Sequence, residues 1–360
     1  MTKEQVVLIK LLSVALAGNK MQLRVQDAVN WRVVIELANR QEVNAIAFDG
    51  YQSIHNTVTE GGMAKHLLLE WFGQTICLER QYKIQYAAAV RLAELYDNNS
   101  IITFVLKGFA IAYCYPIPSH RFSCDLDCFL ATNKKGQERN AYELGNNLME
   151  SYGISVNRDY YKHSVFTYER LYVENHRFCC SVKRGKRTKE LEAFLQELLN
   201  IDDPMFLNDS KLALPPLTFQ ALFLLEHTCA HFLYEKITLK HICDWAMFRK
   251  RYYEALDWLE FDMLCTRFCL KNFAETMNHL ADYLLGAVSY NQLSDLDQRV
   301  LEDTFKEVSL PNHKTLQRIH KAMYVLRSGW KFRYYNDVYM INELTHSIFA
   351  FLFEKDVNLL

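Results

Sequence analysis

The sequence predicts a mostly helical α+β fold, in which a small mixed β-sheet lies between two helical regions. Apolar residues recur at helical spacing over most of residues 3–98 and again from residue 217 onward. Between these regions the chain carries short apolar runs of strand length, which are separated by turn signals. Segregated helices and strands are typical of the α+β class. The predicted regions are an N-terminal helical region (1–98), a core that contains the strands (99–200) and a C-terminal helical domain (201–360).

The N-terminal region is expected to be helical throughout. Residues 25–41 and 63–96 carry apolar side chains at helical spacing. Residues 6–17 are also apolar, but Lys10 interrupts the run and Glu4 lies where a signal peptide is basic. We therefore expect an amphipathic helix here and no signal peptide.

Residues 100–200 are expected to alternate between strands and helices. The predicted strands are 101–106, 126–131, 163–168 and 171–179, and the predicted helices are 109–114, 137–152 and 190–199. The last two strands flank Glu169-Arg170 and are typical of a hairpin. The basic run 182–189 is interpreted as a solvated loop, and a grip on a triphosphate tail or a polyanion is the alternative.

A proline-rich segment, residues 202–216, is predicted to be a linker, because consecutive prolines fit neither a helix interior nor a central strand. Helices are expected at 217–233, 257–285, 297–309, 313–328 and 342–353.

The first of these helices raises the alternative of a zinc site. His227 and His231 lie at i, i+4, and Cys229, His241 and Cys243 are close in sequence. The spacing matches no standard zinc finger, and no Glu follows the first His as in metalloproteases, which argues against zinc.

The main candidate for chemistry is the acidic pair Asp125 and Asp127. Both carboxylates project from the same face, because side chains alternate along a strand. Two adjacent carboxylates repel each other, which raises the pKa of one of them unless a cation binds. Mg²⁺ held by one or two carboxylates and by substrate phosphates is the usual solution, so we expect Mg²⁺ here, with Mn²⁺ as a substitute.

Around this pair the sequence resembles a known family. Lys107-Gly108 ends a predicted strand, Tyr115-Pro116-x-Pro118 follows, and Arg121 precedes Asp125-x-Asp127 by four residues. This pattern resembles the uncharacterised bacterial nucleotidyltransferase family of the DNA polymerase β-like superfamily. The resemblance implies a nucleotidyltransferase-type mixed sheet and transfer of an NMP from an NTP to an acceptor hydroxyl, with release of pyrophosphate.

The resemblance also implies a third carboxylate on a later strand. The family has an apolar-Glu-x-His tract there, and Val173-Glu174-Asn175-His176 fits it, with Asn175 where an apolar residue is usual. Glu174 and His176 then face the same way. Glu169 is a competing candidate, but it lies at the predicted turn.

Three acids suit an in-line displacement at the α-phosphorus that two metal ions assist. In that arrangement Asp125 and Asp127 would bridge both ions. Glu174 would hold the ion nearest the acceptor and take its proton.

Residues for the triphosphate are expected nearby. Gly108 would let the backbone approach phosphates, which the N–H groups of the next helix also favour. Lys107, Arg121 and Ser123 would donate to phosphate oxygens, although a solvated cap is the alternative for Lys107. Cys124 stands where related sequences have Gly, which makes close backbone approach at that point doubtful.

A second tract of the resembled family, Ile-x-Leu-(Arg/Lys)-x-x-x-Asp, matches residues 237–244. By resemblance, Lys240 and Asp244 would close over the nucleotide or hold the helical domain against the core. A buried Lys–Asp pair with only a structural role is the alternative.

Bulk properties restrict the partners. The 360 residues carry a net charge of −1, which gives no general attraction to nucleic acid or to an anionic membrane. Ten cysteines without framework spacing indicate buried thiols in a reducing cytoplasm. No apolar stretch reaches the roughly 18 residues of a membrane span.

The acceptor stays open between a small molecule, a protein side chain and an RNA end. The alternative functions are a catalytically silent nucleotide-binding or regulatory module and a helical interaction scaffold.

Overall fold

The protein has an α+β fold that is mostly helical, with a six-stranded mixed sheet and flanking helices, as predicted. The computed structural model describes residues 1–18, 29–54, 62–132, 140–201, 203–306, 323–324, 326–335 and 345. The helices expected at 313–328 and 342–353 lie mainly outside the described residues.

The N-terminal helices form as the periodicity predicts. They are α1 (Lys3–Ala17), α2 (Trp31–Arg40), α3 (Asn44–Ile54) and α4 (Lys65–Asp97). The α1 helix begins with a capping box, in which Thr2 and Gln5 satisfy each other's backbone N–H groups. It is less amphipathic than expected, because it packs against α2, α3 and a later helix and buries almost every side chain after Val6 except Lys10. Gly50 allows the contact with α3, since a Cβ there would lie 2.0 Å from the Leu11 carbonyl oxygen.

The sheet has the order β3-β4-β2-β1-β6-β5. Its strands are β1 (Ile101–Val105), β2 (Asp125–Thr132), β3 (His163–Tyr168), β4 (Leu171–His176), β5 (Met205–Phe206) and β6 (Leu212–Leu214). The β2 strand is antiparallel to β1 and parallel to β4, and β6 is parallel to β1. The predicted hairpin is confirmed: Glu169 and Arg170 both have positive φ, at 46° and 69°, as in the two-residue turns whose twist matches paired strands.

The segment predicted to be a linker, 202–216, instead contributes two strands to the sheet. The β6 strand is fully buried beside β1, and β5 pairs with β6. Runs of two and three residues carry no detectable periodicity, so the pairing of β6 with β1 and of β5 with β6 decides their conformation. The division of the chain at residues 98 and 200 remains a prediction.

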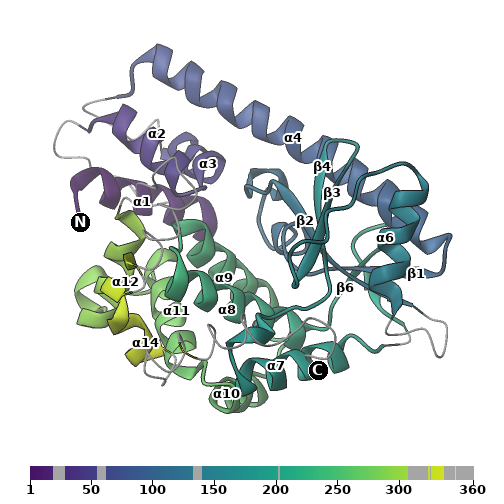
Figure 1. Ribbon diagram of the computed structural model, residues 1–360. Helices are drawn as coiled ribbons and strands as arrows, with labels where there is room; N and C mark the ends of the chain where they lie inside the picture. The colour runs from purple at the N-terminus through teal and green to yellow at the C-terminus, as the bar shows by residue number, and fades with distance from the viewer. Residues whose placement is uncertain are drawn as a thin grey trace.

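Helices cover the sheet and form the C-terminal part. They are α5 (Phe109–Ala112), α6 (Ala141–Ser151), α7 (Lys186–Leu198), α8 (Leu217–Tyr234), α9 (Leu239–Tyr252), α10 (Trp258–Arg267), α11 (Lys271–Leu284), α12 (Asp295–Phe305) and α14 (Gly329–Tyr335). Figure 1 shows the C-terminal helices beside the N-terminal ones, while α4 extends from α2 and α3 to the sheet. Among the described residues, no helix combines the length and apolarity needed to cross a bilayer.

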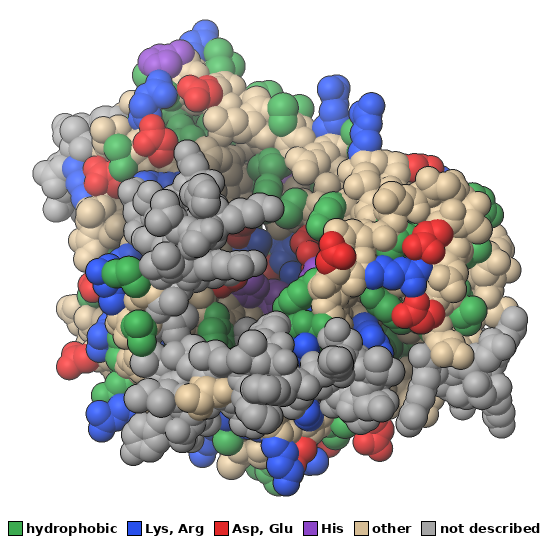
Figure 2. Space-filling model, viewed as in Figure 1, with side chains coloured by type: hydrophobic (Ala, Val, Ile, Leu, Met, Phe, Trp, Pro, Cys, Tyr) green, Lys and Arg blue, Asp and Glu red, His purple; other side chains and the backbone are tan. Residues whose placement is uncertain are grey.

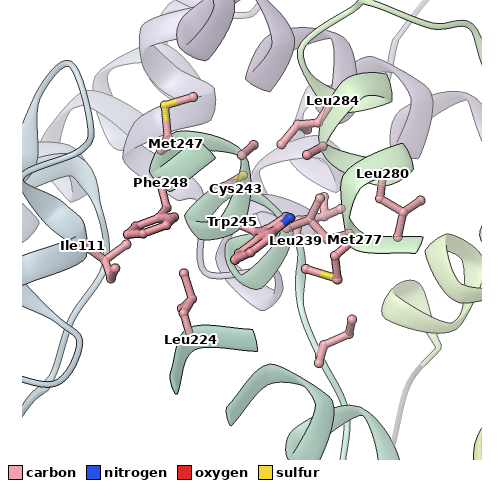
Figure 3. Close-up of a cluster of buried hydrophobic side chains, with 14 of the residues drawn as sticks. Ile111, Leu224, Leu239, Cys243, Trp245, Met247, Phe248, Met277, Leu280 and Leu284 are labelled. Carbon is pink, nitrogen blue, oxygen red and sulfur yellow. The ribbon is translucent and has the colours of Figure 1, made fainter. Parts of the chain in front are cut away.

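One apolar cluster joins the sheet region to the C-terminal helices. Figure 3 shows Leu224 of α8 and Phe248 of α9 close to Ile111 of α5, with side chains of α11 beyond them. All three residues are buried. Because α5 follows directly on β1, this packing fixes α8 and α9 against the end of β1 that Lys107 and Gly108 follow.

Candidate active site

The strand register brings the three predicted acids together. Asp125 and Asp127 lie at the start of β2, and Asp127 is paired with Glu174 on the neighbouring parallel strand β4. All three carboxylates line one pocket of about 420 Å³, the first pocket, between the sheet and α8. Glu169 instead lies in the hairpin turn, where its carboxylate binds Arg91. Figure 2 shows a hollow in this face in which acidic, basic and His side chains gather.

Asp127 is the most buried of the three acids, with 1% of its surface exposed. Its Oδ1 lies 3.1 Å from His176 Nε2, and its Oδ2 lies 3.1 Å from Lys107 Nζ. The Lys107 contact pairs the charges without a well-directed hydrogen bond, so Oδ2 keeps an unsatisfied lone pair. Ligand atoms of Asp127, Glu174 and His176 lie within 4.8 Å of one another, and this is the one such group in the part of the chain that the structure describes. The donor set contains two carboxylates and an imidazole, and one oxygen of Asp127 accepts no hydrogen bond. Such a set fits a divalent cation.

The two aspartates of the pair have opposite pKa shifts. Burial raises the pKa of Asp125, and the negative charge of Asp127 raises it further. Burial also opposes ionisation of Asp127, but Lys107 and His176 outweigh it and hold its pKa well below the ordinary value. The pKa of one carboxylate is therefore raised, as expected for an acidic pair without a cation between its members.

His176 has both ring nitrogens against oxygen acceptors. Nδ1 lies 3.1 Å from the Phe178 carbonyl oxygen, and Nε2 faces Asp127 and Glu174. Burial lowers the pKa of His176, but the bonds to Asp127 and Glu174 raise it above the ordinary value. An imidazole that keeps its proton on Nδ1 can present Nε2 as a lone pair, so His176 can switch from a cation that pairs with carboxylates to a metal ligand.

A second pocket of about 300 Å³ adjoins the first. The two pockets share Lys107, Asp125, His227 and His231. The second pocket also contains Gly108, Arg121, Ser123, Lys240 and Asp244, which are predicted to bind the nucleotide. His176, which belongs to the same prediction, lines the first pocket instead.

Gly108 lines the second pocket and makes the turn between β1 and α5. Its φ of 63° is one that other residues rarely adopt, and a Cβ there would lie 3.3 Å from Ser123 Oγ. The Ser123 hydroxyl donates to the Asp125 carbonyl oxygen at 3.3 Å. The following helix, α5, has only four residues, so its backbone N–H groups rather than a macrodipole would favour an anion.

Arg121 and Asp244 bind each other. Arg121 Nε donates to Oδ1 at 3.0 Å and its Nη2 donates to Oδ2 at 2.7 Å, while the Tyr115 hydroxyl donates to Oδ1 at 2.7 Å. All three residues are buried. Asp244 thus holds α9 against the core, but through Arg121 and not through Lys240. Lys240 instead pairs with Glu42 at 2.7 Å.

A family model described as "Uncharacterised nucleotidyltransferase" matches residues 27–286. The chain belongs to this nucleotidyltransferase family. The match includes every strand of the sheet and all the residues of both pockets. No curated protein and no solved structure shows a significant match to the chain.

Two further histidines of the site follow from signals in the sequence. His163 Nε2 lies 3.5 Å from Glu174, and its position opposite His176 follows from the two-residue turn of the hairpin. His227 Nε2 lies 3.3 Å from Lys107 Nζ, so this member of the His-x-x-x-His pair contacts a predicted phosphate ligand rather than a zinc site. Burial and neighbouring cations, Lys107 first, lower the pKa of His227 well below its ordinary value, so it accepts from the Lys107 ammonium.

The segment before Arg121 is anchored to the N-terminal helices by His120. Its Nδ1 lies 2.8 Å from Asp49 of α3, and its Nε2 lies 2.9 Å from Glu79 of α4. Burial lowers the pKa of His120, but the two carboxylates outweigh it and raise the pKa above the ordinary value. A group with a raised pKa in the folded state stabilises the fold fully below its unfolded pKa, and this stabilisation is lost as pH rises through the folded pKa.

We therefore expect His120→Gln to lower the free energy of unfolding by about 1–3 kcal/mol near pH 5.5, because two bonds to a buried cation are lost. The difference from the unsubstituted protein should shrink above pH 7. Urea unfolding of both proteins across this pH range measures it, and the exposed His279→Gln is the control. A difference that grows with pH contradicts this account of His120.

Proposed function

We propose that this protein is a nucleotidyltransferase of the DNA polymerase β-like type, which transfers an NMP from an NTP to an acceptor hydroxyl and releases pyrophosphate. The supporting observation is the convergence of Asp125, Asp127 and Glu174 from two adjacent strands on one pocket. Membership of a nucleotidyltransferase family supports the same chemistry.

Asp125, Asp127 and Glu174 would hold Mg²⁺, with Mn²⁺ as a substitute that suits the His176 nitrogen better. When bound, the metal lowers the pKa of the attacking hydroxyl and neutralises the charge on the leaving pyrophosphate. The Glu174 side chain is 23% exposed, against 1% for Asp127, and would take the proton of the acceptor. His163 and His176 orient its carboxylate.

We place the NTP in the second pocket and the acceptor in the first. The second pocket has four basic side chains, Lys107, Arg121, Lys236 and Lys240, against three acidic ones. Together with the backbone at Gly108, this balance suits a triphosphate. Asp125 and Lys107 line both pockets. The α-phosphorus of the NTP would therefore lie beside them, between the leaving pyrophosphate and the acceptor hydroxyl.

An NTP with Mg²⁺ is expected to raise the melting midpoint by roughly 3–4 °C at about 100 times its dissociation constant, because it binds only the folded state. Thermal unfolding with each of the four NTPs, with and without Mg²⁺, measures this. A shift with any NTP that needs Mg²⁺, together with pyrophosphate release on adding acceptors, supports the enzyme.

The two alternatives give other outcomes. A silent nucleotide-binding or regulatory module would show the NTP shift without pyrophosphate release. A helical interaction scaffold would show no shift with any NTP, and that result would overturn the proposed function.

A further inference from the structure

Glu226 of α8 is a buried carboxylate whose role neither the fold nor the proposed reaction explains. Only 7% of its surface is exposed, and it lines the first pocket on the α8 side. Among the described residues it has no hydrogen bond and no ion pair, although Lys162 lines the same pocket. Ala230 and Tyr234, which lie about one and two turns further along α8, line the same pocket.

An unpaired carboxylate at such a position costs stability unless something in the pocket compensates it. Glu226 is not part of the metal-ligand group formed by Asp127, Glu174 and His176. A single carboxylate apart from those ligands suits an ammonium group, which needs one counter-charge and a few hydrogen-bond acceptors.

The charge balance of the first pocket points the same way. Its lining contains five acidic side chains, Asp125, Asp127, Glu174, Glu226 and Glu235, against Lys107 and Lys162. The second pocket has the opposite balance. Once the three catalytic acids are assigned to the metal, the first pocket still has an acidic wall, formed by Glu226 on α8 and by Glu235 at the C-cap of α8, which pairs with His231. This wall would repel a polyanion such as an RNA end and attract a cation.

We propose that the acceptor is a small hydroxyl compound that carries a protonated amine, and that Glu226 binds this amine. The inference rests on the proposed function and specifies its acceptor. The acceptor oxygen forms a bond to the α-phosphorus, the bond from the α-phosphorus to the bridging oxygen of pyrophosphate breaks, and the hydroxyl proton passes to Glu174. The ammonium group does not react. A volume of about 420 Å³ suits a molecule of one or two sugar rings.

Glucosamine, glucose and glucose 6-phosphate test this directly, because they share the same sugar ring and differ in charge, and glucosamine and glucose also have nearly the same shape. Each is added to the protein saturated with a non-hydrolysable ATP analogue and Mg²⁺, and the further change in melting midpoint is measured. We expect a further rise with glucosamine alone. In Glu226→Gln the apparent affinity for glucosamine should fall about 10- to 100-fold, the effect of losing a charged hydrogen bond. The rise with the ATP analogue should be unchanged.

Glu226→Gln should also leave the melting midpoint of the free protein the same or higher, because it removes a buried charge without a partner. A lower midpoint would assign Glu226 a structural role instead. Glu190→Gln, on the exposed face of α7, is the matched control and should change none of these values. An equal response to the three sugars, a response to glucose 6-phosphate alone, or no response to glucosamine overturns the inference and leaves NTP binding intact. No rise with the corresponding analogue of any of the four NTPs overturns the proposed function itself.

Discussion

The Asp125→Asn variant is expected to lose pyrophosphate release by about 1,000-fold while the protein stays folded. The loss reflects several kcal/mol of transition-state stabilisation that a metal-bridging carboxylate supplies. The fold should survive, because the pKa of Asp125 is raised by burial and by Asp127, so its charge is unfavourable in the folded protein. Removing that charge relieves repulsion, and the melting midpoint should stay the same or rise.

Asp127→Asn is the matched comparison, one step along the same face of β2. It should lose activity equally, but it should also lower the free energy of unfolding by about 3–5 kcal/mol, because Lys107 and His176 are left buried beside a neutral group. Pyrophosphate release and urea unfolding of both variants separate the two effects. Activity retained in Asp125→Asn contradicts the metal-bridging role, and equal stability changes in the two variants contradict the charge assignment.

Asp244→Leu is expected to lower the free energy of unfolding by about 3–5 kcal/mol. It leaves the Arg121 guanidinium buried without its bidentate partner and removes the acceptor of the Tyr115 hydroxyl. Because Arg121 precedes β2 and Asp244 lies on α9, the loss should also loosen α9 from the core. Urea unfolding measures the change, and Asp282→Leu, whose pair with Arg249 is partly exposed, is the control.

The double variant Arg121→Met with Asp244→Leu should recover most of this loss, because replacing both members of a buried pair by apolar residues is often neutral. It also decides whether Arg121 contacts the nucleotide. If the pair is only structural, the recovered protein keeps the melting shift produced by NTP and Mg²⁺. If Arg121 binds phosphate, the double variant folds but loses that shift.

Much of the site can be predicted from the local spacing of residues in the sequence. Period two along a strand puts Asp125 and Asp127 on one face, and the two-residue turn at Glu169-Arg170 sets the hairpin register. Positive φ at Gly108 agrees with the turn expected after the first strand. Each of these features depends on residues close together in the chain, where sequence spacing and spatial position are directly related.

Pairings between segments that are distant in the sequence cannot be predicted in the same way. A structural Lys240–Asp244 pair is one of the alternatives that the sequence leaves open, yet Asp244 pairs with Arg121, more than a hundred residues earlier. Residues 205–206 and 212–214 lie in the segment that its prolines predict to be a linker, and only the pairing of β6 with β1 and of β5 with β6 makes them strands. Nothing in the sequence marks Glu226 as a residue of the site, because a Glu in an apolar helix gives the same pattern whether its side chain faces solvent, a partner or a pocket.

The sequence by itself determined most of the helices, four of the six strands, the acidic face of β2 and the family to which the pattern at residues 107–127 points. Only the tertiary structure decided which cation lies beside which carboxylate, and that the three acids line one pocket next to a second pocket of opposite charge balance. The physical reason is range: backbone periodicity and turn geometry act over a few residues, whereas charge pairing and burial depend on which distant segments the packed core brings into contact.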